Sequence, residues 1–140
     1  MLKRLSHACL GSGDLARTIT FYRDVLGCTV AHEFRNDRDE LYGAMLSCGG
    51  GTFLEFFRDA EPKPLGGRFR HLCFEVRDIE EAAGRLRALG HACEVRRGRT
   101  DRIPQFFIHD PDGLMIEFHQ HDAESVLLPW LPGAPEKEGS

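Results

Sequence analysis

The sequence predicts an α+β fold made of two tandem βαβββ modules, and three observations support it. The first is an internal repeat, because an ordered set of residues recurs in the second half of the chain at an offset of 64 to 62 residues. The second is that each half runs from an apolar segment into an aspartate, a helical pattern and a glycine. The third is that strand-like segments follow each helix. The matched pairs are His7 and His71, Asp14 and Asp78, Gly27 and Gly90, and Glu55 and Glu117.

Each module begins with a strand and a helix. The two strands are predicted over residues 3–10 and 69–76. Asp78 and Glu81 form an acidic capping-box pattern at the start of the second helix, and Gly90 supplies its C-terminal stop. Apolar residues recur at helical spacing at Leu15, Ile19, Tyr22, Val25 and Leu26 in the first helix, and at Ile79, Ala82, Ala83, Leu86 and Leu89 in the second.

The remainder of each module is strand-like. Turn residues separate its last two strands, as "GGG" at 49–51 and "DPDG" at 110–113. The predicted strands are 28–34, 40–48 and 52–58, and then 91–96, 104–109 and 114–120. The chain is therefore divided into a first module at 1–60, a proline-containing linker at 61–68, a second module at 69–121 and a partly disordered C-terminal tail at 122–140, all within one domain.

Composition and charge are typical of a soluble globular protein. The 140 residues are 41% hydrophobic, and the net charge of −4 gives no broad attraction to nucleic acid or to an anionic membrane. We recognise no signal peptide and no segment long enough to span a bilayer. Five cysteines without CxxC spacing indicate reduced thiols in a cytoplasmic protein.

Strand alternation predicts which side chains share a face. His7 lies on the first strand of its module, and Glu55 lies on the last strand, both among apolar neighbours. The second module repeats this arrangement with His71 and Glu117. A carboxylate in apolar surroundings is costly unless a cation or a donor compensates it. Two histidines and two glutamates would suit a divalent first-row metal.

Two sequence features resemble a known family. The opening "H-x-(5)-GDLARTITFYRDVLG" and the ending "DPDG-x-x-IEF" are similar to the vicinal oxygen chelate superfamily, over roughly residues 4–121. That superfamily includes glyoxalase I, methylmalonyl-CoA epimerase, extradiol dioxygenases, and the fosfomycin and bleomycin resistance proteins. The resemblance implies that the paired modules curve into an open mixed sheet around a metal site.

The resemblance also implies a ligand set and a reaction. The four ligand positions of glyoxalase I fall on His7, Glu55, His71 and Glu117. In glyoxalase I, the two glutamates move a proton between adjacent carbons while the metal stabilises an enediolate, so Glu55 and Glu117 are the candidate catalytic residues. The implied cofactor is one divalent ion of nickel, zinc, cobalt, manganese or iron. The implied substrate is a small molecule that chelates the metal through vicinal oxygens.

Two alternatives to this lactoylglutathione lyase-type function stay open. An extradiol-type dioxygenase would use His7, His71 and Glu117, and a metal-free binding or resistance protein would only hold a small ligand.

The residues that bind glutathione in glyoxalase I are not matched in this sequence. Gly11 stands where bacterial glyoxalase I relatives usually carry an arginine, and Arg58 and Asp59 stand near the position of a usual asparagine.

Several residues near the candidate ligands carry secondary predictions. Cys9 and Cys73 lie two residues past the histidines, and we expect small pocket-lining or core residues rather than thiolate ligands. His119 shares a face with Glu117, and it would either orient a ligand or contact substrate, or lie at the surface at the end of its strand. The tail, with Trp130, is expected to pack on the domain or on a partner subunit, and the expected assembly is a homodimer.

Overall fold

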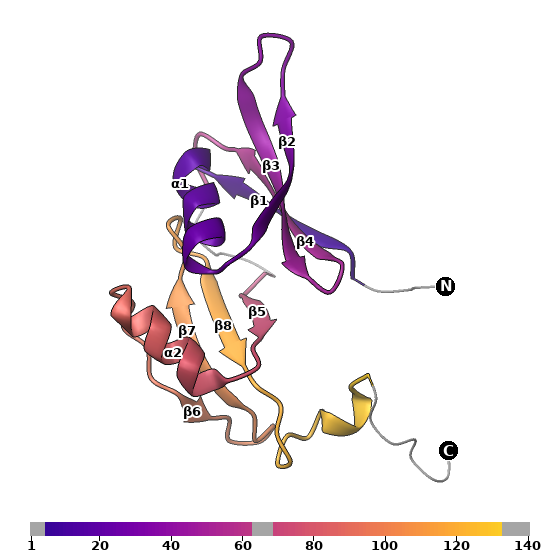
Figure 1. The fold of residues 1–140 in the computed structure, drawn as a ribbon, viewed down its shortest axis with the longest axis vertical. Helices are drawn as coiled ribbons and strands as arrows, with labels where there is room; N and C mark the ends of the chain where they lie inside the picture. Colours follow the sequence, from indigo (N-terminus) through magenta and orange to yellow (C-terminus); the bar gives the residue numbers. More distant parts are fainter. Residues whose placement is uncertain (1–4, 63–68, 133–140) are drawn as a thin grey trace. The chain divides into compact units, whose positions relative to one another are not determined.

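The computed structural model describes residues 5–62 and 69–132, and it confirms the α+β class and the repeated strand–helix–strand order (Figure 1). The first half contains β1 (His7–Ser12), α1 (Leu15–Thr20), a π-helical turn (Phe21–Val25), β2 (Thr29–Arg35), β3 (Leu41–Gly49) and β4 (Thr52–Arg58). The second half contains β5 (Leu72–Glu75), α2 (Ile79–Ala88), β6 (Arg96–Arg97), β7 (Pro104–His109), β8 (Met115–His119) and a 3₁₀ turn (Leu128–Trp130).

Each half forms its own four-stranded mixed sheet. The strand orders are β1-β4-β3-β2 and β5-β8-β7-β6, so the last strand of each module lies beside its first strand. These first and last strands pair in parallel, and the other neighbours pair antiparallel. The parallel pair therefore brings the two ends of each module together.

The predicted helix boundaries are confirmed at both ends. The Asp14 carboxylate accepts a hydrogen bond from the backbone N–H of Arg17 at 3.0 Å, which caps α1. Asp78 caps α2 by accepting from the N–H groups of Glu80 and Glu81. Gly27 and Gly90 follow the helical segments with φ values of +77° and +91°, a conformation that glycine adopts at little cost.

The first strands, predicted at 3–10 and 69–76, are observed at His7–Ser12 and Leu72–Glu75, and two further elements differ more strongly. The first helix is not α-helical throughout, because its second part is a π-helical turn that buries two consecutive aromatic residues, Phe21 and Tyr22. The strand predicted at 91–96 is present only as Arg96–Arg97. Its ladder pairs Arg97 with Pro104, whose nitrogen carries no hydrogen to donate, so the pairing is short.

The core lies on one face of each sheet, under the helix. In the first half, Tyr22 packs on Phe56 with a ring-centroid distance of 4.8 Å. In the second half, Phe106 stacks on Phe118, also at 4.8 Å. Because alternate residues face opposite sides of a strand, the histidines and glutamates of interest lie on the other face of each sheet.

The chain divides into two compact units, and both are discontinuous in sequence. The first unit contains β1–β4 and α1 together with Asp110–Leu114, and the second contains Phe69–His109 and the chain from Met115 onward. Within the first unit, the buried hydroxyl of Tyr22 donates to Asp110 Oδ2 at 3.0 Å. Asp110 Oδ1 accepts from the N–H groups of Asp112 and Leu114, which closes the predicted "DPDG" turn.

Some predictions fall at the margins of the described residues. Residues 63–68 of the linker and 133–140 of the tail lie outside them, and the module boundaries stay predictions. The described part of the tail contacts the second unit, because the Val126 N–H donates to the Asp101 carbonyl at 3.1 Å. All five cysteines are free thiols, as predicted. Among the described residues, no helix has the length and apolar character needed to cross a membrane.

Candidate metal centre

The first half brings His7 and Glu55 together. His7 lies at the start of β1, and Glu55 lies in the middle of β4, directly opposite Cys9 in the parallel ladder. His7 Nε2 is 3.9 Å from Glu55 Oε2, and the two side chains are 44% and 16% exposed. The glutamate is therefore largely shielded from solvent, but its histidine partner is at an ion-pair distance rather than a hydrogen-bond distance.

The second half repeats this pair with a shorter distance. His71 precedes β5, and its Nε2 atom is 2.9 Å from Oε2 of Glu117 on β8. Their side chains are 37% and 12% exposed. Both sequence-predicted pairs are thus formed within their own halves. The histidines are more exposed than their apolar surroundings suggested, because the core lies on the opposite face of each sheet.

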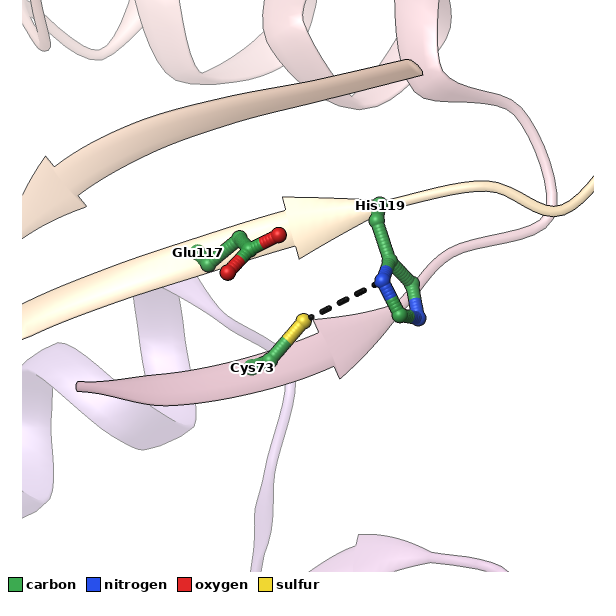
Figure 2. A group of neighbouring side chains, drawn as sticks. All are labelled: Cys73, Glu117 and His119. Carbon is green, nitrogen blue, oxygen red and sulfur yellow. Dashed lines mark hydrogen bonds between the residues drawn. The ribbon is translucent and has the colours of Figure 1, made fainter. Parts of the chain in front are cut away.

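A second set of donors surrounds Glu117. Figure 2 shows Cys73 of β5 and Glu117 and His119 of β8 as side chains of neighbouring strands. One ligand atom from each of the three lies within 4.8 Å of the other two. The thiol of Cys73 is 3.4 Å from His119 Nδ1, which is within hydrogen-bond range for sulfur. His119 therefore lies beside Cys73 and Glu117, and its role stays a prediction.

Electrostatics at this group favours neutral donors when no cation is bound. Loss of hydration and the nearby carboxylates of Glu117 and Glu75 raise the pKa of the Cys73 thiol to about 12. Partial burial lowers the pKa of His119, and the positive charge of the neighbouring His121 lowers it further. Its imidazole is therefore neutral at pH 7. A neutral imidazole beside a carboxylate and a polarisable thiol is a donor set that fits a divalent first-row metal.

Sequence reasoning assigned no role to His121. Its ring centroid lies 4.5 Å from that of His119, and its Nδ1 atom is buried without a hydrogen-bond partner among the described residues. Continuing the alternation 117, 119, 121 past the end of β8 would have indicated this histidine. It places a further nitrogen beside the donor set of the second half.

The side chain of Asp59 lies close to Gly11. A Cβ atom built on Gly11 would lie 2.7 Å from Asp59 Oδ2 and 3.0 Å from Asp59 Cβ. The Asp59 side chain therefore fills the space that a side chain at position 11 would need. A carboxylate therefore lies next to the position at which the resemblance to glyoxalase I expects an arginine.

Aromatic side chains lie beyond Glu55 on the same sheet. The ring of Phe57 stacks on that of Tyr42 with a centroid distance of 5.9 Å, and the ring centroids of Phe34 and Phe57 are 5.1 Å apart. Phe57 is two residues past Glu55 on β4, so the two side chains share a face. This group, which we call the aromatic cluster, gives the first half an apolar surface next to its histidine–glutamate pair.

Known proteins share the sequence pattern and the fold of this chain. YaeR of Escherichia coli K12 is 34% identical over 128 residues, which covers 85% of this chain and 97% of YaeR. A Neisseria meningitidis protein named lactoylglutathione lyase is 33% identical over 129 residues, which covers 84% of this chain and 90% of that protein. The crystal structure of SMU.1112c superposes with a TM-score of 0.76 at 32% identity, covering 85% of this chain and 99% of that one.

A sequence model of one protein family also matches most of the chain. The match covers residues 4–118, which includes both histidine–glutamate pairs and the whole of both sheets apart from the last residue of β8. The chain therefore belongs to the Glyoxalase/Bleomycin resistance protein/Dioxygenase superfamily.

Proposed function

We propose that this protein is a metal-dependent enzyme of the glyoxalase I type, which moves a proton between adjacent carbons of a small oxygen-chelating substrate. One observation carries the proposal. In each half, a histidine at or just before the first strand lies beside a glutamate of the last strand. The Nε2–Oε2 distance is 3.9 Å for His7 and Glu55 and 2.9 Å for His71 and Glu117. Membership of the superfamily and 33% identity to a protein named lactoylglutathione lyase support it.

In this proposal, one divalent ion takes its ligands from His7, Glu55, His71 and Glu117. Nitrogen and oxygen donors of this kind suit nickel, zinc, cobalt, manganese or iron. When bound, the metal would supply Lewis acidity that offsets the negative charge developing on the vicinal oxygens of the substrate.

The two glutamates have different surroundings, and we assign their roles accordingly. Glu55 lies 3.9 Å from His7, so no direct hydrogen bond from that imidazole ties up its carboxylate, and we assign it as the base that first accepts the substrate proton. Glu117 lies 2.9 Å from His71, which holds it in place. We assign Glu117 to the positioning of the ligand set and to the second proton-transfer step.

The substrate is proposed not to carry the carboxylate of glutathione at the usual place. Asp59 fills the space beside Gly11, and a carboxylate there repels an anionic group. The aromatic cluster of Phe34, Tyr42 and Phe57 offers apolar contact area near Glu55. A hemithioacetal of a neutral or cationic thiol fits these groups better than one formed with glutathione.

The test combines metal analysis with turnover. Purified full-length protein is expected to bind one divalent metal per chain and to isomerise the hemithioacetal of methylglyoxal with cysteamine faster than the hemithioacetal with glutathione. Glu55→Gln is expected to lower kcat by about 100-fold or more, because it removes the proposed base. Glu94→Gln, an exposed change on the second half, serves as the matched control.

Two results would overturn the proposal in different ways. Failure to bind any divalent metal, with His71→Ala leaving small-ligand binding intact, would favour the metal-free binding protein. Oxygen consumption with a catechol, dependent on His7, His71 and Glu117 but not on Glu55, would favour the extradiol-type dioxygenase.

We also propose a cytoplasmic homodimer as the working assembly. The superfamily resemblance supports the dimer, and five free thiols are consistent with a reducing compartment. Light scattering on the purified protein is expected to give about twice the chain mass of 15.8 kDa. A mass equal to one chain would contradict the assembly.

A further inference from the structure

The cysteine, glutamate and histidine shown in Figure 2 converge because of the strand pairing in the second sheet. β5 and β8 run parallel, with Cys73 directly opposite Glu117. His119 is two residues further along β8, so it lies on the same face as Glu117. The Cys73 Sγ atom and the His119 Nδ1 atom are 3.4 Å apart.

The first half contains a cysteine–glutamate pair in the same register but not the same donor set. Cys9 lies opposite Glu55 in the parallel ladder of β1 and β4, as Cys73 lies opposite Glu117. The position that corresponds to His119 is Phe57, at the same offset of 62 residues that relates Glu55 to Glu117. Phe57 packs into the aromatic cluster and has no ligand atom to offer.

Two further observations point to a cation at the second-half group. Glu117 also has His71 Nε2 at 2.9 Å, so two imidazoles and one thiol surround a carboxylate whose side chain is 12% exposed. The adjacent His121 has a buried Nδ1 atom without a hydrogen-bond partner among the described residues. His71, Cys73, Glu117 and His119 thus lie together within one compact unit, and their arrangement does not depend on the other unit.

We propose that Cys73 is a thiolate ligand and His119 a nitrogen ligand of the metal that binds Glu117. This inference rests on the proposed metal-dependent function, and it assigns to Cys73 a role that the sequence alone did not favour. On binding, the S–H bond of Cys73 breaks, its proton passes to solvent, and the sulfur lone pair forms the bond to the divalent ion. No electron is transferred, and no further reactant is needed.

A sulfur ligand changes which metal the protein selects. Thiolate favours zinc and cobalt over the harder manganese and magnesium ions, which prefer carboxylate, carbonyl and water oxygens. The cysteine, glutamate and histidine of the second half would therefore set the metal preference.

Cobalt(II) spectroscopy tests the proposal without relying on activity. Full-length protein is titrated with Co²⁺ in the presence of a non-thiol reductant, and the near-ultraviolet region is monitored for thiolate-to-cobalt charge transfer. The band is expected in the unmodified protein and in Cys9→Ser, and it is expected to be lost in Cys73→Ser. His119→Phe, which introduces the residue found at the matching position of the first half, is expected to weaken Co²⁺ binding by roughly ten- to a hundred-fold.

The outcomes separate this proposal from the proposed function. Binding of Co²⁺ without any charge-transfer band would overturn the thiolate ligand and leave the four-residue centre standing. A band that survives in Cys73→Ser and disappears in Cys9→Ser would also overturn it. Absence of Co²⁺ binding altogether would overturn both proposals. Thermal unfolding of Cys73→Ser, compared with Cys9→Ser, checks that the variant is folded.

Discussion

The two halves of this protein share a strand order but differ on the face that carries the candidate ligands. In the first half, Glu55 lies 3.9 Å from His7 and is followed on its strand by Phe57 of the aromatic cluster. In the second half, Glu117 lies 2.9 Å from His71 and is followed by His119, with Cys73 alongside. The comparison shows that one repeated scaffold can carry two different sets of side chains around its glutamates, because the core packs on the opposite face of each sheet.

The halves also differ at the edge of the sheet. In the first half, β2 has seven residues and pairs along the length of β3. Its counterpart β6 has only two residues. The guanidinium of Arg97, the second residue of β6, donates to the two carboxylate oxygens of Asp122 at 3.1 Å and 2.7 Å, so the start of the tail holds this edge by side-chain contacts.

The largest expected effect concerns the two matched core phenylalanines. Phe56 and Phe118 occupy corresponding positions and are both buried beneath a helix. Replacement of either by alanine is expected to lower the free energy of unfolding by about 3–5 kcal/mol, through lost burial and the cavity left behind. Urea unfolding followed by circular dichroism measures it. If one variant loses less than about 1 kcal/mol, the two cores are not equivalent.

The second prediction compares the two glutamates as metal ligands. Glu117→Gln is expected to weaken divalent metal binding by about 100-fold and Glu55→Gln by about 10-fold, because more donors gather around Glu117. Competition with a chromophoric chelator gives both affinities, and Glu94→Gln is the control. Equal losses in the two glutamine variants would remove the asymmetry between the halves.

The third prediction concerns a polar contact of the first unit. Tyr22→Phe is expected to lower the free energy of unfolding by about 1.5 kcal/mol, because the buried phenol donates to the carboxylate of Asp110. The matching residue in the second half, 64 positions later, is Leu86 on the buried face of α2. It has no hydroxyl, so no equivalent hydrogen bond can be removed there. Tyr42→Phe, at a more exposed ring, is the control and is expected to change stability little. An unchanged urea midpoint in Tyr22→Phe would contradict the prediction.

The smallest expected effect concerns the Arg97–Asp122 contact. The hydrogen bonds from Arg97 lower the pKa of Asp122 from its ordinary value of 3.8 to about 2. A carboxyl group with a depressed folded-state pKa stabilises the fold above its ordinary pKa and loses that contribution as the pH falls through about 2. Asp122→Asn is therefore expected to show a slightly flatter decline of melting temperature between pH 4 and pH 2. Identical acid profiles would show that the tail contact does not support β6.

Much of the fold could be predicted from the sequence because its signals are local or periodic. The caps at Asp14 and Asp78 and the glycines at 27 and 90 fix the helix boundaries through short-range backbone chemistry. The repeat then supplied the order of helices and strands along the chain, although not the order of the strands within each sheet. The length of β6 was not predictable, because it depends on which residues of a distant strand can pair, and Pro104 ends that ladder.

The candidate site was only partly predictable for a related reason. Alternation with a period of two assigned each histidine and glutamate to one face, and the structure forms both pairs. Alternation does not say which face the helix covers when both faces carry apolar residues, so the exposure of the histidines was missed. The approach of Cys73 to His119 depends on parallel register and side-chain rotamers, which sequence spacing does not specify.

The discontinuous first unit has a consequence for the synthesis of the protein. A chain that emerges from the ribosome N-terminus first exposes Tyr22 long before Asp110, the carboxylate that accepts its hydroxyl, has been made. Until then, the growing first half has a phenol that cannot be buried in its final hydrogen-bonded form. Its completion therefore waits for the "DPDG" turn, so the order of translation couples the folding of the first half to the arrival of the second.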